Sequence, residues 1–109
     1  MADEWKGFVN QLKDEAGALA KGELFGLIGS SKEDSEEFVR RQAEKVEKYL
    51  NQLALGEITK DDLVLYMKQI QRLNEMQALK LSVAAKASAQ RLTSGIQNLI
   101  LDKLLKLIP

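Results

Sequence analysis

Apolar residues recur at three- and four-residue spacings along most of this 109-residue chain, the spacing that gives a helix one apolar face. These stripes predict four helical segments, over about residues 3–21, 32–55, 60–93 and 96–108. Between the first two we expect a glycine-rich apolar connector or a short, separately oriented helix, 22–31, because Gly22, Gly26 and Gly29 interrupt the first stripe. The pattern predicts an all-α fold, a small bundle of three to four helices.

Capping residues mark the ends of the two central helices. Ser30 and Ser31 offer N-caps to the second helix, and Gly56 follows it where a glycine C-cap is expected. Thr59 is the expected N-cap of the third helix. Because the connector between them is so short, the second and third helices are predicted to form a central antiparallel hairpin.

The composition agrees with this fold. The chain has a single proline, Pro109, and is rich in Ala, Leu, Glu, Lys and Gln, which favour helix. A length of 109 residues fits one domain. The prediction is therefore one helical domain, residues 1–109.

The predicted third helix carries apolar residues on two sides. Its main stripe includes Leu63, Met67 and Leu92, and a second group on the back comprises Leu65, Met76, Leu79 and Val83. Two apolar faces imply two partners, so this helix is either central in the bundle or shared with another chain. Asn74 interrupts the main stripe, and a buried amide needs hydrogen-bond partners.

The C-terminal segment is the most apolar part of the chain, with eight Ile or Leu among residues 96–108. On an unbroken α-helix its apolar arc would be centred about 140° away from the stripe that contains Leu92. Either the chain breaks at 93–95, or one long helix turns its apolar face to a different partner there. The segment is expected to lie within the bundle, in an oligomer interface or among lipid headgroups.

The residue types argue against catalysis. The chain has no histidine and no cysteine, so the usual neutral-pH base, thiolate chemistry and the commonest metal ligand are missing. Acidic clusters such as Glu33, Asp34 and Glu36 lie in a first helical turn, where the helix dipole explains them. We expect a protein that is not an enzyme, binds no cofactor or metal, and has no evident small-molecule substrate.

Charge distribution and targeting signals bear on the possible partners and on the cellular location. Net charge is zero, but residues 1–62 are acidic and residues 63–109 are basic. This asymmetry fits halves that complement each other within a hairpin or dimer, or a basic half that meets an anionic surface. The basic residues scatter around the third helix, which speaks against nucleic-acid binding. Without a secretory signal or a membrane span, a cytoplasmic location is expected.

These observations predict a non-catalytic interaction or assembly module, either a homo-oligomer or a protein that binds another protein, of unknown pathway. The predicted contact surface comprises Leu65, Met76, Val83, Ile100, Leu101, Leu104, Leu105 and Ile108. The alternative is peripheral binding to a membrane surface through the N-terminal amphipathic helix and the apolar C-terminal helix. Its predicted contact residues are Trp5, Phe8, Lys103 and Lys106.

Overall fold

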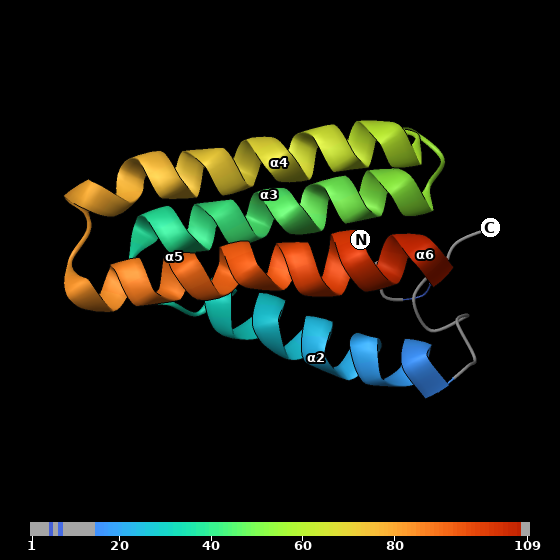
Figure 1. The fold of residues 1–109 in the computed structure, drawn as a ribbon, viewed down its shortest axis with the longest axis horizontal. Coiled ribbons are helices and arrows are strands. Elements are labelled where there is room, and N and C mark those ends of the chain that lie inside the picture. The colour runs from blue at the N-terminus through green and yellow to red at the C-terminus, as the bar shows by residue number, and fades with distance from the viewer. Residues whose placement is uncertain (1–4, 6, 8–14, 108–109) are drawn as a thin grey trace.

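The computed structural model describes Trp5, Gly7 and residues 15–107, and within them the chain folds as an antiparallel helical bundle (Figure 1). The long helices are α2 (Glu15–Lys32), α3 (Glu37–Ala54), α4 (Lys60–Gln77) and α5 (Val83–Gly95). Three short elements complete them, the 3-10 turn η1 (Ala78–Lys80), the π-helix η2 (Ile96–Leu104) and α6 (Leu105–Leu107). The predicted all-α bundle is confirmed.

The four rods run alternately in opposite directions, and η2 and α6 extend α5 (Figure 1). Each rod contacts its neighbour along the chain, and α2 contacts α5, which closes the ring. The predicted antiparallel hairpin is the pair α3–α4. As a consequence, the α2–α3 turn and the α4–α5 turn lie on opposite edges of the same end of the bundle.

Residues 22–31 form neither a connector nor a separate helix, because α2 runs from Glu15 through all three glycines to Lys32. Leu24 and Ile28 are buried one turn apart, and Phe25 and Leu27 pack against the same core. Burying two such side chains yields about 3–6 kcal/mol, which matches or exceeds the total cost of about 3 kcal/mol for three helical glycines. The helix predicted at 3–21 lies largely outside the described residues.

The α3–α4 hairpin forms as its capping residues predict. Gly56 has φ +75°, the left-handed conformation that ends a helix, and α3 stops two residues before it. The Thr59 hydroxyl accepts a hydrogen bond from the Asp62 N–H, and the Asp62 carboxylate accepts one from the Thr59 N–H. The predicted N-caps Ser30 and Ser31 are wrong, because both lie inside α2. After the turn at 33–36, α3 starts at Glu37 instead of residue 32.

The predicted single helix at 60–93 is wrong, because the chain reverses direction at Leu81 and Ser82. Leu81 is extended, and the Ser82 hydroxyl caps α5 by accepting a hydrogen bond from the Ala85 N–H at 3.1 Å. The break therefore falls more than ten residues before the one considered at 93–95. It makes α4 and α5 antiparallel neighbours and divides the apparent two-faced helix into two ordinary ones.

Gly95 does not break the last rod, which continues from α5 into η2. A Cβ at this position would clash with Leu27 Cδ2, so the missing side chain lets Leu27 of α2 pack directly on the rod. The glycine therefore serves close helix packing rather than a turn.

The π-helix η2 resolves the mismatch between the two apolar arcs. Its backbone hydrogen bonds reach five residues back, as from the Leu105 N–H to the Ile100 carbonyl. Wide turns advance each residue by about 82° instead of 100°, so nine residues accumulate a lag of about 160°. A lag of this size offsets the expected displacement of about 140° between the two arcs. Ile96, Ile100 and Leu104 consequently face the same core as Leu92.

The core extends along most of the bundle and contains the C-terminal segment. Its buried members are Trp5, Leu24, Ile28, Val46, Leu50, Leu63, Met67, Ile70, Leu92, Ile96, Leu99, Ile100 and Leu104. Of the three locations considered for the apolar tail, the structure shows the first, burial within its own bundle.

Candidate partner-binding surface

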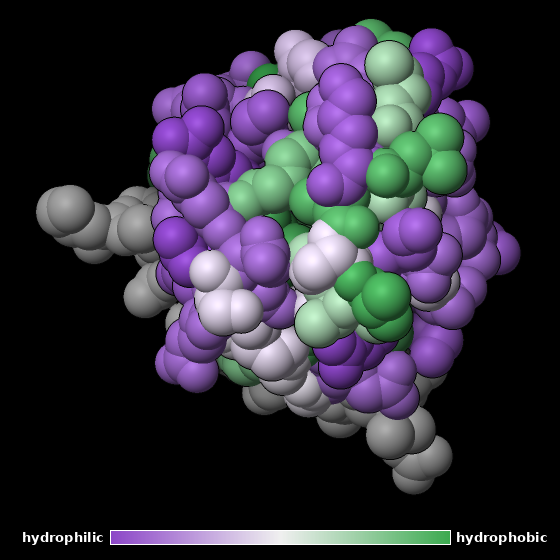
Figure 2. All heavy atoms as spheres, turned by 90° about the vertical axis from the view of Figure 1, so that its left-hand side faces the viewer, coloured by the Kyte–Doolittle hydropathy of each residue, from purple (hydrophilic) through white to green (hydrophobic). Residues whose placement is uncertain are grey.

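Three large apolar side chains are exposed around the turn between α4 and α5. Met76 is 64% exposed, Leu79 is 88% exposed and Val83 is 87% exposed, and we call these three residues the apolar cluster. Figure 2 views this end of the bundle and shows apolar side chains gathered over its centre and right, with hydrophilic ones around them. Single exposed apolar residues are ordinary, but a group of them within one turn marks a candidate contact surface.

The local fold explains why these side chains stay outside. Leu79 lies in η1 and Val83 opens α5, so both belong to the reversal that joins the two helices. The inward positions nearby are filled by small residues of α5, Ala85 and Ala89.

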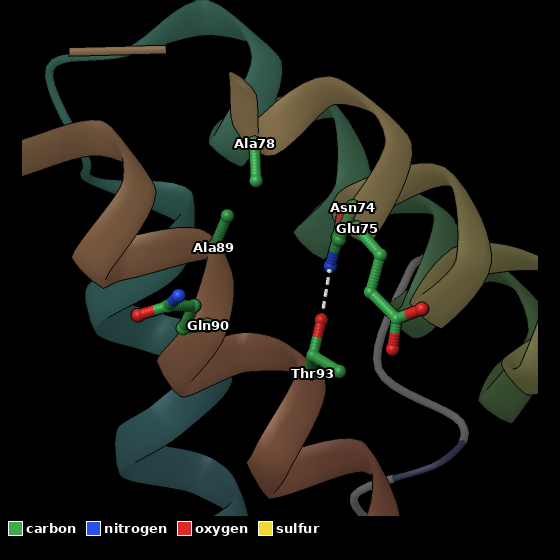
Figure 3. Close-up of a pocket in the computed structure, with 6 residues that line it drawn as sticks. All are labelled: Asn74, Glu75, Ala78, Ala89, Gln90 and Thr93. Atoms are coloured by element: carbon green, nitrogen blue, oxygen red, sulfur yellow. Dashed lines mark hydrogen bonds between the residues drawn. The ribbon is translucent and has the colours of Figure 1, made fainter. Parts of the chain in front are cut away.

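A pocket of about 350 Å³ lies in the seam between α4 and α5, close to this turn. Its lining residues are Asn74, Glu75, Ala78, Ala89, Gln90 and Thr93. Figure 3 shows Ala78 and Ala89 pointing toward each other across the seam, which leaves the space that larger residues would fill. The volume is at the lower end of the range typical of small-ligand sites and could also take one side chain of a partner.

The floor of the pocket is polar. Asn74 is 2% exposed, and its Nδ2 donates a 2.9 Å hydrogen bond to Thr93 Oγ1 (Figure 3). Asn74 Oδ1 is buried and has no hydrogen-bond partner among the residues that the structure describes. One turn away, Gln71 Nε2 donates to the Thr93 carbonyl at 3.3 Å and to Gln97 Oε1 at 3.4 Å. These amides cross-link α4 and the last rod, so the predicted need of Asn74 for partners is half met.

Charges of opposite sign occupy the two turns at this end. The acidic turn, formed by Glu33, Asp34 and Glu36, joins α2 to α3, whereas Lys80 and Lys86 belong to the α4–α5 turn and the first turns of α5. In the described part of the chain, neither Glu33 nor Glu36 forms an ion pair, and neither lysine does.

Asp34 differs from the other acidic residues of its turn. A hydrogen bond with the Ser88 hydroxyl, the Glu36 N–H at 2.9 Å, and the positive charges of Arg91 and Arg40 lower the pKa of its carboxyl below the ordinary value. Ser88 and Arg91 belong to α5, so Asp34 ties the α2–α3 turn to the last rod.

The predicted contact residues divide into three groups. Met76 and Val83 lie in the apolar cluster, and Leu65 is exposed on α4 about three turns from Met76. Ile100 and Leu104 are buried in the core, and Leu101 and Leu105 are partly buried against it. Ile100 and Leu104 were wrongly placed in a contact surface, because η2 turns them inward, whereas the partly buried Leu101 and Leu105 stay predictions. Ile108 lies outside the described residues. Leu79 was not among the predicted contact residues. Its exposure could have been predicted, because it belongs to the second apolar group on the back of the predicted third helix.

The residues predicted to contact a membrane are not brought together as a lipid-facing surface. Trp5 is buried, its ring lies edge-on to Phe25 with centroids 5.0 Å apart, and its Nε1 donates to Glu47 Oε2. Its assignment to lipid is therefore wrong. Phe8 lies outside the described residues. Lys103 and Lys106 are exposed, and Lys103 Nζ lies 4.0 Å from the Glu23 carboxylate.

The fold and this surface define the chain as an up-and-down helical bundle with a polar pocket and an apolar cluster at one end. No protein-family model, curated protein or solved structure matches it. Among the described residues, no helix is long and apolar enough to span a membrane, and no three acidic side chains form a group that could hold a metal ion.

Proposed function

We propose that this chain is a non-catalytic, partner-binding bundle whose contact surface is the α4–α5 end. The observation that carries the proposal is the apolar cluster, three large side chains that are each more than 60% exposed, from the last turn of α4 to the first residue of α5. Covering such side chains releases about 1.5–3 kcal/mol each before ordering costs, enough to drive a moderate association. A cytoplasmic location stays part of the proposal.

The neighbouring pocket supports the same function. An apolar cluster beside a pocket with a few polar groups is the arrangement that lets a partner insert one anchoring side chain and cover the rest. The sequence supplies the non-catalytic half of the proposal, since neither histidine nor cysteine is present to act as a base or nucleophile.

Site-specific photo-crosslinking in an extract of the source organism tests this proposal. A photoreactive residue at position 79 is expected to give a defined crosslink, identified by mass spectrometry. The matched control is position 55, since Leu55 is also exposed but lies at the opposite end of the bundle. Unlabelled protein should compete the crosslink away, and its Val83→Glu variant should not. Equal crosslinking from both positions would refute the proposal.

A pocket-filling variant separates the pocket from the cluster. Ala78→Leu places a larger side chain in the pocket and leaves the apolar cluster intact. We expect a weaker crosslink from position 79 if a partner side chain enters the pocket. An unchanged crosslink would limit the contact surface to the cluster.

A further inference from the structure

We propose that the occupant of the α4–α5 end is a second copy of this chain, joined end to end about a twofold axis. This inference rests on the proposed function and names its partner. The observation behind it is the distribution of charge over one face: a carboxylate-rich turn and a lysine-bearing turn at opposite edges of the same end of the bundle.

The topology fixes this arrangement. In a ring of four antiparallel rods, the α2–α3 and α4–α5 connections occupy opposite edges of one end. Glu33 and Glu36 lie at the first edge, and Lys80 and Lys86 lie at the second. None of these four charges forms an ion pair in the part of the chain that the structure describes. The end face therefore has available charges of both signs.

A twofold axis that runs between the two edges makes this face complementary to itself. When two ends meet about that axis, the acidic turn of each copy lies opposite the lysines of the other. A uniformly acidic partner would place negative charge opposite Glu33 and Glu36. A uniformly basic partner would place positive charge opposite Lys80 and Lys86. Because both halves belong to one end, the association closes at two copies instead of growing into a filament.

Apolar surface is present on both sides of the axis. The apolar cluster lies at the lysine-bearing edge, and the partly buried ring of Phe38 lies in the first turn of α3, beside the acidic turn. The cluster of one copy can therefore cover Phe38 of the other. The two shorter dimensions of the molecule, 27 and 24 Å, give an end face of the order of the ~800 Å² that each partner buries in a standard interface. We expect a dimer of micromolar affinity, weakened by salt.

Sedimentation equilibrium of the full chain over a wide concentration range tests the inference. The expected result is a concentration-dependent rise from the monomer mass of 12.2 kDa toward twice that value. Leu79→Glu should raise the dissociation constant at least about tenfold, and the matched control Leu55→Glu should leave it unchanged. Circular dichroism confirms that each variant remains helical. A monomer at all concentrations, or a dimer indifferent to Leu79→Glu, would overturn the inference.

Charge exchange tests the twofold arrangement independently of the cluster. The double variants Glu33→Lys with Glu36→Lys, and Lys80→Glu with Lys86→Glu, should each dimerise about tenfold more weakly than the native chain. Mixing the two variants should restore association as a heterodimer, because each then presents the charge that the other lacks. Without restoration, the proposed axis is wrong. A monomeric chain that still crosslinks to a different protein from position 79 would refute the second copy and leave the proposed function standing.

Discussion

The indole N–H of Trp5 donates a 3.1 Å hydrogen bond to Oε2 of Glu47, a buried carboxylate in the middle of α3. The other carboxylate oxygen accepts a 2.8 Å bond from Lys32 at the end of α2. One acidic side chain thus joins three separate parts of the chain. Its burial is compensated by a charged partner and by hydrogen bonds, which is the condition for placing a carboxylate inside a helical bundle.

Removing this carboxylate is expected to destabilise the bundle. Glu47→Ala deletes the acceptor of both bonds and should lower the free energy of unfolding by about 2–4 kcal/mol. Glu47→Gln keeps an acceptor and loses only the charge, so it should cost less. Urea denaturation followed by circular dichroism measures both. Equal stability of all three proteins would show that the contact is energetically neutral.

Gly95 and Leu27 should be energetically coupled. Gly95→Ala is expected to lower the free energy of unfolding by about 1–3 kcal/mol, because the added Cβ displaces Leu27. In a Leu27→Ala background the same substitution should stabilise by about 1 kcal/mol through helix propensity. A double-mutant cycle of urea denaturations measures this reversal of sign. Stabilisation in both backgrounds would mean that Leu27 moves aside freely.

The glycines of α2 should behave in the opposite way. Gly26→Ala and Gly29→Ala should each raise the free energy of unfolding by about 0.5–1 kcal/mol, since both positions are helical and open around the added Cβ. Gly56→Ala is the matched control and should destabilise by about 1 kcal/mol, because its φ is +75°. Thermal unfolding of the three variants gives the comparison. A loss of stability at Gly26 or Gly29 would contradict helical structure there.

The π-helix predicts an unusual tolerance to deletion. Removing the exposed Asp102 lets the segment return to α-helical spacing, with Leu104 eleven positions after Leu92 and within about 20° of it. The cost should stay below about 1.5 kcal/mol. Deleting the exposed Lys68 is the control; it rotates Ile70 away from the core and should cost at least about 3 kcal/mol. Similar losses from both deletions, measured by urea denaturation, would contradict this account of η2.

The lowered pKa of Asp34 implies a specific dependence of stability on pH. Because the folded pKa lies below the unfolded one, the unfolded state takes up a proton first as the pH falls. The contribution of Asp34 is therefore full above about pH 3.9 and is lost as the pH falls through the folded pKa. Asp34→Asn should be less stable at pH 6, by no more than about 1 kcal/mol, with a gap that closes as the pH falls through the folded pKa of Asp34. A stability difference between Asp34→Asn and the native chain that does not change with pH would show that side-chain packing, and not charge, causes it.

Local signals in the sequence determine the parts of the fold that could be predicted. Thr59, Asp62 and Gly56 act within a few residues of themselves, so the α3–α4 hairpin could be derived from capping chemistry alone. Ser82 carried an equally local signal for the α4–α5 turn. That signal was missed because an unbroken apolar periodicity around it favoured one long helix.

Other features depend on partners distant in the chain. The glycines of α2 suggest a connector until the burial of Leu24 and Ile28 is known. Gly95 suggests a break until Leu27 is seen to pack against it. The burial of Ile100 and Leu104 depends on wide helical turns, which an α-helical periodicity cannot represent. Of the candidate surface, Met76 and Val83 were predicted because their apolar character conflicts with the main stripe.

Trp5 gives the chain an internal fluorophore. It is the sole tryptophan, and its bonds to Glu47 and Asn51 place it toward the end of the bundle away from Leu79 and Val83. Its fluorescence emission therefore reports whether the core is intact, and substitutions at the α4–α5 end should not alter it directly. A surface variant that loses association while its emission spectrum stays native has lost binding and kept its shape.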